Sequence, residues 1–268
     1  MMIKTLKILM TTATVFIIAA LMITFLIISE FPSDTEISGC INTRLFHVFL
    51  CPSSSNYTKL NEISPNLLKT VVLTEDSTFW NHHGFDLDEL QKSFKKNMEK
   101  GTYVRGGSTI TQQLAKNLYL SKEKSLLRKI KEALITIRIE KSLSKKQILE
   151  RYFNVVQFGK NLYGIKQASN FYFKKAPSDL SVFESTFLTF LLPSPERYSS
   201  SYFKRELTPF AERRLSQIID NLYAYQRISS TEYSIAKNEL DVFFKKASTA
   251  TTLETLPMEQ EPSPEFFD

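Results

Sequence analysis

The chain contains 268 residues, of which 43% are hydrophobic and 23% charged, with seven glycines and two cysteines. This length suits one ordinary globular domain or two small ones, and the composition excludes collagen-like, disulfide-framework and wholly disordered proteins. The 34 Lys and Arg residues against 28 Asp and Glu give a net charge of +6, which favours an anionic partner.

An uncharged apolar run occupies residues 8–28, preceded by Lys4 and Lys7 and followed by acidic residues from Glu30 onward. Its length matches the hydrocarbon core of a bilayer, about 30 Å at 1.5 Å per helical residue. The charges on either side then place residues 1–7 in the cytoplasm and the rest of the chain outside. A cleaved signal peptide is the competing interpretation, but the run is long for one and no A-x-A site follows it.

Residues 29–63 are rich in Ser, Pro and Asn, and we interpret them as a juxtamembrane connector whose structure the sequence leaves open. Cys40 and Cys51 lie within it. Outside the cytoplasm they could pair, or they could be two unrelated thiols.

The predicted globular domain spans residues 64–244, and its signals are those of helices. Ser64 followed by Pro65 is typical of a helix start, and several later segments carry capping boxes. Apolar residues then recur at helical spacing, and no long stretch alternates with period two, so the predicted fold class is mostly α. Two such stripes are Leu87, Leu90, Phe94, Met98 and Leu126, Ile130, Ala133, Ile137. The apolar stretch 182–192 is too short for a membrane span and predicts a buried or interfacial helix, while the tail 245–268 has the composition of a disordered segment.

The basic excess is confined to the middle of the chain. Between Lys92 and Arg151 there are 16 Lys or Arg and 5 Asp or Glu, so this segment carries +11 and the remainder −5. A domain outside the cytoplasm rarely meets nucleic acid, so phosphates at a membrane surface are the better match. A solvated helical face is the alternative, especially for the four lysines between Lys92 and Lys100.

Two glutamates have informative positions. Glu75 continues the apolar helical face of Leu68, Val71 and Val72, where partial desolvation would raise its pKa and favour general acid–base chemistry. A buried carboxyl held by a neighbouring cation is equally compatible with that position. Glu132 lies four residues after Arg128, and this spacing fits either an ordinary surface ion pair or an acid among cations that face a phosphorylated group.

Three further patterns concern binding. The turn at Gly106-Gly107-Ser108-Thr109 precedes a helix and would offer backbone N–H groups to an anion, but it lacks the lysine and the preceding strand of a nucleotide site. Asp86 fits a helix cap better than a metal motif. The adjacent histidines His82 and His83 do not make a zinc-type ligand set.

Five motifs stand in order between Glu75 and Tyr198, and together they resemble the peptidoglycan glycosyltransferases of glycosyltransferase family 51, in particular the monofunctional biosynthetic transglycosylases. The second motif, GGSTITQQLAKN, is matched throughout and is the most specific. The motifs cover Glu75–Asp86, Gly106–Asn117, Arg128–Glu140, Ile148–Phe173 and Glu184–Tyr198. The chain departs from the family pattern at Ser169, Lys174, Ser185, Thr186, Thr189 and Lys124, positions that concern packing and charge geometry more than either glutamate.

The resemblance implies a lysozyme-like head lobe with a smaller jaw lobe, behind a single N-terminal transmembrane helix. It also implies polymerisation of lipid II with inversion at the anomeric carbon, forming β-1,4 linkages and releasing undecaprenyl pyrophosphate. Glu75 would be the general base, and Glu132 would act with the cations at the leaving group. The substrate-binding residues implied are Asp76, Gly107, Ser108, Thr109, Gln112, Gln113, Lys116, Lys124, Arg128, Lys129 and Asn154.

The resemblance also implies a divalent cation, Mg²⁺ or Mn²⁺, whose ligands the sequence does not identify. No nucleotide or organic cofactor is expected. The implied partners are lipid II, the growing glycan strand and membrane lipids; penicillin-binding transpeptidases and division or elongation proteins are candidates, and nucleic acid is not. The implied location is the cytoplasmic (inner) membrane, with the catalytic domain on its outer side. Two rival hypotheses remain at this stage: a lysozyme-like or lytic glycan-cleaving enzyme, and a catalytically inactive membrane-anchored scaffold.

Overall fold

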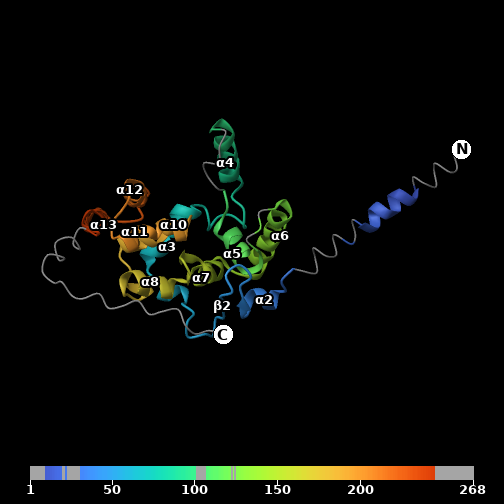
Figure 1. Cartoon of the computed structure of the whole chain (residues 1–268), viewed down its shortest axis with the longest axis horizontal. Helices are drawn as coiled ribbons and strands as arrows, with labels where there is room; N and C mark the ends of the chain where they lie inside the picture. The colour runs from blue at the N-terminus through green and yellow to red at the C-terminus, as the bar shows by residue number, and fades with distance from the viewer. Residues whose placement is uncertain are drawn as a thin grey trace.

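The computed structural model describes residues 10–19, 22, 31–100, 107–121, 123 and 125–244, and these form a mostly helical protein (Figure 1). The predicted fold class is thereby confirmed at this level, while the division into head and jaw lobes stays a prediction. The helices from residue 31 onward are α2 (Asp34–Ser38), η1 (Leu60–Glu62), α3 (Pro65–Glu75), α4 (Leu87–Lys100), α5 (Ile110–Tyr119), α6 (Leu126–Ser142), α7 (Lys145–Val155), α8 (Ile165–Phe173), η2 (Pro177–Asp179), α9 (Val182–Leu191), α10 (Pro195–Tyr198), α11 (Ser200–Lys204), α12 (Pro209–Ala224) and α13 (Ser230–Val242). Two short antiparallel pairs, β1 (Ile41–Asn42) with β2 (Phe49–Leu50) and β3 (Gln157–Gly159) with β4 (Leu162–Tyr163), complete the described elements.

The core is built around α3, α5, α7 and α9. Helix α9 packs against α3, α12 and α13, and α5 packs against both α6 and α7. Phe187 and Leu188 of α9 are fully buried, so the apolar stretch that contains them is a core helix. Burial of such side chains contributes about 1.5–3 kcal/mol each, which is why the helices around α9 hold together without disulfides of their own.

Capping side chains begin the helices where the sequence predicts. Ser64 Oγ accepts the Asn66 N–H, Asp86 Oδ1 accepts the Glu89 N–H, and capping boxes start α5, α7 and α9. Each cap satisfies a backbone donor that would otherwise be unpaired, at a gain of about 1 kcal/mol. Asp86 is therefore a helix cap, as predicted.

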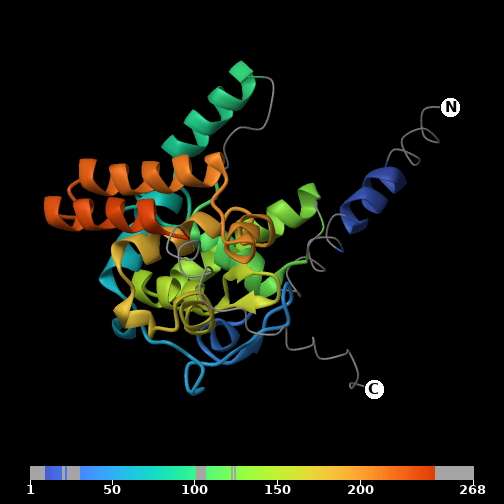
Figure 2. The same cartoon turned by 60° about the vertical axis from the view of Figure 1, so that its left-hand side comes forward.

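Two apolar stripes that resemble core-facing patterns are exposed. In α4, Leu87 and Phe94 are 70% and 66% exposed, and this helix extends away from the others in both views (Figures 1 and 2). In α6, Leu126 and Ile130 are 79% and 45% exposed, and the buried face instead carries Glu132, Ile135, Thr136 and Ile139. Because Glu132 lies on the buried face of α6, the surface ion pair considered for it is wrong. Spacing shows that a helix has an apolar face, but it does not show whether other parts of the protein cover that face.

The segment expected to be a connector has defined structure from residue 31. A disulfide joins Cys40 to Cys51 across the β1–β2 pair. The guanidinium of Arg151 in α7, which is 3% exposed, donates to the backbone carbonyls of Ser38 and Gly39. The segment is thus attached to the helical domain by a buried cation as well as by packing of α2 against α6.

The expected anchor at residues 8–28 lies largely outside the described residues, which include only the helical stretch 10–19 and residue 22. No helix within the described ranges is both long and apolar enough to cross a membrane. The tail 245–268 also lies outside the described residues.

The departures from the family pattern have visible structural consequences. Lys174 ends α8 with φ of 55°, in the left-handed region where glycine carries no Cβ penalty. The buried hydroxyls of Ser185 and Thr186 have no hydrogen-bond partner among the described residues, whereas Ser169 Oγ donates to the Lys166 carbonyl.

Candidate active site

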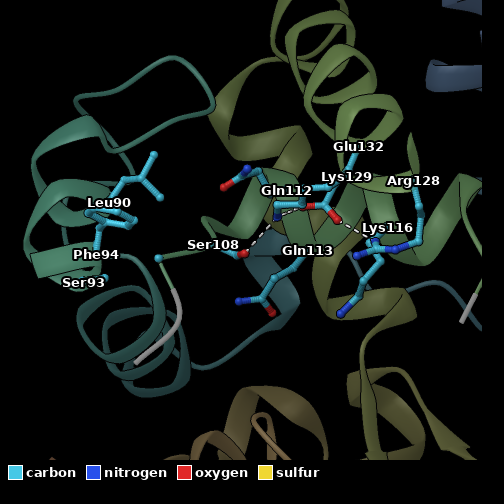
Figure 3. Close-up of a pocket in the computed structure, with 11 residues that line it drawn as sticks. Leu90, Ser93, Phe94, Ser108, Gln112, Gln113, Lys116, Arg128, Lys129 and Glu132 are labelled. Carbon is cyan, nitrogen blue, oxygen red and sulfur yellow. Dashed lines mark hydrogen bonds and ion pairs between the residues drawn. The ribbon is translucent and has the colours of Figure 1, made fainter. Parts of the chain in front are cut away.

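A cavity of about 440 Å³ opens where α4, α5 and α6 meet (Figure 3). Most of the residues predicted for substrate binding line it, on a surface that also includes apolar side chains of α4. The lining residues are Leu90, Ser93, Phe94, Gly107, Ser108, Gln112, Gln113, Lys116, Arg128, Lys129 and Glu132. Of these, three are cations and one is an anion, so the described lining has an excess of positive charge.

Glu132 lines this cavity and forms ion pairs with two cations. Its side chain is 3% exposed; Arg128 Nη1 donates to Oε2 over 2.8 Å, and Lys129 Nζ pairs with Oε1. Lys129 Nζ also donates to Ser108 Oγ at 3.3 Å, which connects α6 to the turn before α5. A buried carboxylate that already holds two cations is suited to positioning them for an external anion rather than to accepting a proton.

Lys116, on α5, faces the same cavity and is influenced by both glutamates. Burial lowers its pKa from the ordinary 10.5, Arg128 and Lys129 lower it further, and the charges of Glu132 and Glu75 act in the opposite direction. An ammonium group that is partly desolvated beside two other cations gains most from a bound anion. This point of the cavity is therefore suited to an anionic ligand.

Glu75 is the last residue of α3 and has a different environment. Gln113 Nε2 donates to its Oε2 over 3.0 Å, and the Tyr152 hydroxyl donates to Gln113 Oε1 over 3.1 Å, which fixes the orientation of that amide. No cation forms an ion pair with Glu75 among the residues that the structure describes. Burial raises the pKa of Glu75 above its ordinary 4.5, against the lowering effect of the Gln113 hydrogen bond. A carboxyl in this state can accept a proton during a reaction.

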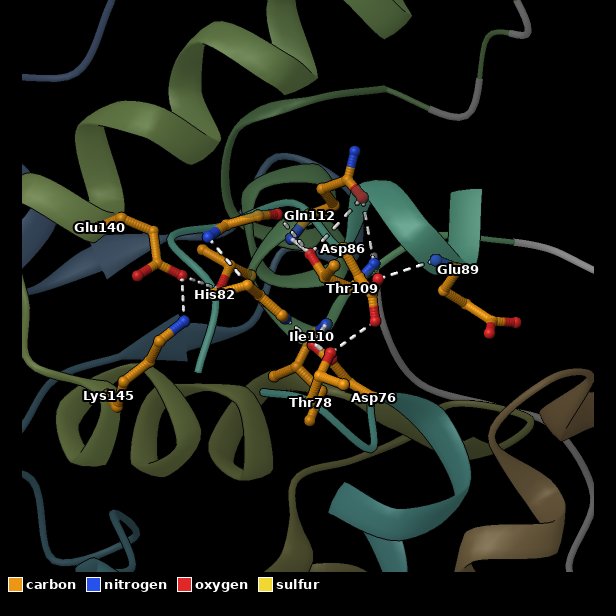
Figure 4. A network of polar contacts seen from close by, with 12 residues as sticks. Asp76, Thr78, His82, Asp86, Glu89, Thr109, Ile110, Gln112, Glu140 and Lys145 are labelled. Carbon is orange, nitrogen blue, oxygen red and sulfur yellow. Dashed lines mark hydrogen bonds and ion pairs between the residues drawn. The ribbon is translucent and has the colours of Figure 1, made fainter. Parts of the chain in front are cut away.

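Four other predicted site residues use their polar atoms within the protein. Asp76 accepts hydrogen bonds from His82 and from the N–H of Ile110 (Figure 4). Thr109 and Gln112 form the capping box of α5, in which the side chain of each residue accepts the backbone N–H of the other. Asn154 does not line the cavity.

The Asn154 amide instead exchanges two hydrogen bonds with the backbone of Thr58, each 2.8 Å long, and donates to the Glu150 carbonyl. Lys124 and Gly106 lie outside the described residues. The structure thus gathers Gly107, Ser108, Gln112, Gln113, Lys116, Arg128, Lys129 and Glu132 around one cavity. Glu75, Asp76, Thr109 and Asn154 are not among the described residues that line it.

Sequence reasoning missed two residues near Glu75. Arg214 of α12 exerts the largest charge effect on Glu75, a lowering of its pKa, and α12 packs against α3. Tyr152 is fully buried and orients Gln113. Arg214 follows the last motif, and its link to Glu75 arises only from helix packing; Tyr152 stood within the fourth motif, but nothing in its spacing indicated a hydrogen bond to Gln113.

The described residues alone do not fit a metal site. Both Glu132 oxygens are bonded to cations, and no group of three or more His, Cys, Asp or Glu side chains within the described ranges could hold a metal ion.

The helical domain has a basic cavity with one carboxylate held by two cations, and Gln113 of its lining bonds to a second carboxyl, that of Glu75. These features define the class: an enzyme acting on an anionic substrate. The family model described as Transglycosylase matches residues 43–222. A biosynthetic peptidoglycan transglycosylase from Acinetobacter baylyi is 45% identical over 150 residues, covering 56% of this chain and 67% of the relative. Those from Thiobacillus denitrificans and Cupriavidus metallidurans are 48% and 39% identical, over 52% and 64% of this chain and 60% and 75% of the relatives. The chain belongs to the transglycosylase family.

Proposed function

We propose that this protein is a peptidoglycan glycosyltransferase that polymerises glycan strands from lipid II. One observation carries the proposal: a single site joins a carboxyl with a raised pKa to a cluster of cations organised by a second, buried carboxylate. Family membership and the names of the relatives support the same activity.

Glu75 is the general base of the proposed reaction. It removes the proton from the acceptor sugar's 4-hydroxyl, whose oxygen attacks the anomeric carbon of the donor while the bond to pyrophosphate breaks. The α linkage of the donor becomes a β-1,4 linkage, and the proton remains on Glu75 until solvent removes it. Gln113 supports this role, because its hydrogen bond holds the carboxylate oxygen in a fixed position.

The cations serve the leaving group. Lys116, Arg128 and Lys129 neutralise the charge that develops on the pyrophosphate, and Glu132 keeps the last two in place. Gly107 and Ser108 border the same space, and Lys124 extends the basic set in the proposal. Donor and acceptor held in one cavity also supply part of the rate enhancement by proximity.

The proposed location is the outer side of the cytoplasmic membrane, with residues 8–28 as a single anchor. The Cys40–Cys51 disulfide supports an oxidising compartment. The exposed apolar side chains Leu90 and Phe94 of α4 line the basic cavity, an arrangement suited to a lipid surface that carries phosphates. Transpeptidases and division or elongation proteins remain candidate partners.

The divalent cation also remains a prediction. Because the described residues do not make up a metal site, we expect any Mg²⁺ or Mn²⁺ requirement to depend on the substrate's pyrophosphate. Titrating each ion into a polymerisation reaction tests it.

The decisive experiment incubates the full-length protein with labelled lipid II. We expect polymer that lysozyme digests, and no shortening of preformed glycan. Shortened glycan without new polymer would identify a hydrolase instead. If neither new polymer nor shortened glycan forms, the protein is a catalytically inactive scaffold.

A further inference from the structure

The loop between α3 and α4 is held by a buried pair of side chains, Asp76 and His82. Their side chains are 1% and 9% exposed, and His82 Nε2 lies 2.8 Å from Asp76 Oδ1. The other carboxylate oxygen of Asp76 accepts the N–H of Ile110, the first residue of α5, over 2.9 Å (Figure 4). Both oxygens of Asp76 are thus engaged inside the protein.

The hydrogen bonds of His82 define its tautomer. The Gly84 N–H donates to Nδ1 over 3.1 Å, so Nδ1 is an acceptor and the ring proton resides on Nε2. His82 therefore donates to one oxygen of Asp76 and the Ile110 N–H donates to the other, at the N-terminal end of α5, where a carboxylate is favoured.

The same contacts connect the helices that carry the site. Asp76 directly follows Glu75, and its partner Ile110 lies three residues before Gln113, whose amide bonds to Glu75. The Thr109 hydroxyl donates to the Gly84 carbonyl over 2.7 Å. A Cβ atom added to Gly84 would lie only 2.7 Å from the side chain of Thr136 in α6, so a larger residue would clash. The loop is consequently fitted against α5 and α6 together.

We propose that Asp76 and His82 are positioning residues that set the placement of Gln113 relative to Glu75, and that Asp76 is not a substrate ligand. This inference rests on the proposed role of Glu75 as general base. The chain of contacts runs from His82 through Asp76 to the first turn of α5, and from α5 back to Glu75 through Gln113. Loss of the His82 donor frees one end of that chain.

Two substitutions separate the two ring nitrogens. His82→Gln places an amide donor near the position of Nε2 and keeps the bond to Asp76, whereas His82→Asn offers an acceptor near Nδ1 and loses that bond. We expect His82→Asn to lower kcat for lipid II by at least about tenfold with KM changed less than about threefold, because a small misplacement of the base slows the chemical step. His82→Gln should stay within about threefold of wild type in kcat. His83→Asn, an exposed neighbour, serves as the matched control and should leave both constants unchanged.

The outcomes are distinguishable from failure of the proposed function, which would appear as no polymer from the wild-type protein. If wild type polymerises and both His82 variants lose activity together with thermal stability, the role is merely structural and the inference is overturned. A rise in KM without loss of kcat in Asp76→Asn would make Asp76 a substrate ligand and also overturn it. If His82→Asn does not fold, a folded His82→Gln decides alone: kcat near wild type supports the inference, and a tenfold or greater loss contradicts it.

Discussion

The two glutamates of the site occupy regions that differ in almost every physical respect. Around Glu132, two cations bond directly to a carboxylate that is 3% exposed. Around Glu75, the direct partner is the neutral amide of Gln113, and burial raises the carboxyl's pKa. Both regions belong to one site, because Gln113, which bonds to Glu75, lines the same cavity as Glu132.

The comparison teaches that environment, rather than residue type, assigns the roles. Two carboxyl groups in different surroundings can take different roles within one active site. Glu132 is bonded directly to two cations, whereas desolvation raises the pKa of Glu75 and prepares it to take up a proton. Substitutions at the two glutamates and their neighbours, and changes of pH, can test this difference.

Removing the base should have the largest effect. Glu75→Gln keeps the size and hydrogen-bonding capacity of the side chain but cannot accept a proton, so kcat for polymerisation should fall by about 10³-fold. Circular dichroism should show an intact fold. Wild-type rates from this variant would remove Glu75 from the chemistry.

Removing one cation should weaken use of the donor. Arg128→Ala deletes a partner of Glu132 that faces the cavity, so kcat/KM for lipid II should fall by about 100-fold. Arg138→Ala is the matched control, since Arg138 lies on the same helix, is exposed, and does not line the cavity. Equal activity in the two variants would reduce Arg128 to a structural ion pair.

The pH dependence should reflect Glu75 on its acid side. A general base must be deprotonated, so kcat/KM should fall as pH decreases through the Glu75 pKa, at a pH above the ordinary 4.5. Arg214→Gln should move this acid limb to higher pH, because the positive charge of Arg214 lowers the pKa of Glu75. An acid limb that shifts to lower pH, or does not move, would contradict the proximity of Arg214 to the base.

Stability should change in opposite directions at the two glutamates. A carboxyl whose folded pKa is raised stabilises the protein most below its unfolded pKa and loses that contribution as pH rises through the folded value. At neutral pH, Glu75→Gln should therefore raise the melting temperature by about 1–3 °C. Glu132→Gln leaves two cations without their carboxylate and should cost about 1–2 kcal/mol. Thermal melts at pH 7 measure both, and equal signs would mean that the two environments do not differ as described.

Local patterns in the sequence were sufficient to predict the helices and their starts. Capping at Ser64, Asp86 and Thr109 depends on neighbours within three residues, so spacing alone identifies it. The clustering of Lys116, Arg128 and Glu132 was expected from the resemblance, and the cavity that they line is consistent with it.

What could not be predicted depends on contacts between distant segments. The apolar stripes of α4 and α6 are real, but whether another helix covers them is a tertiary property, and here none does among the described residues. The effect of Arg214 on Glu75 and the bond between Asn154 and Thr58 likewise arise only when helices pack. The turn from Gly107 to Thr109 was predicted only in part. The sequence indicated an anion site, and Gly107 and Ser108 line the cavity, but the Thr109 hydroxyl donates to the Gly84 carbonyl.

The most direct test measures donor binding and polymerisation separately in the two glutamate variants. Equilibrium binding of a non-reactive lipid pyrophosphate analogue is compared with the single-turnover polymerisation rate for Glu75→Gln and Glu132→Gln. The account predicts that Glu75→Gln binds the analogue as wild type does but does not polymerise, whereas Glu132→Gln binds at least about tenfold more weakly. The reverse pattern, with binding lost at Glu75 and retained at Glu132, would contradict the division of roles.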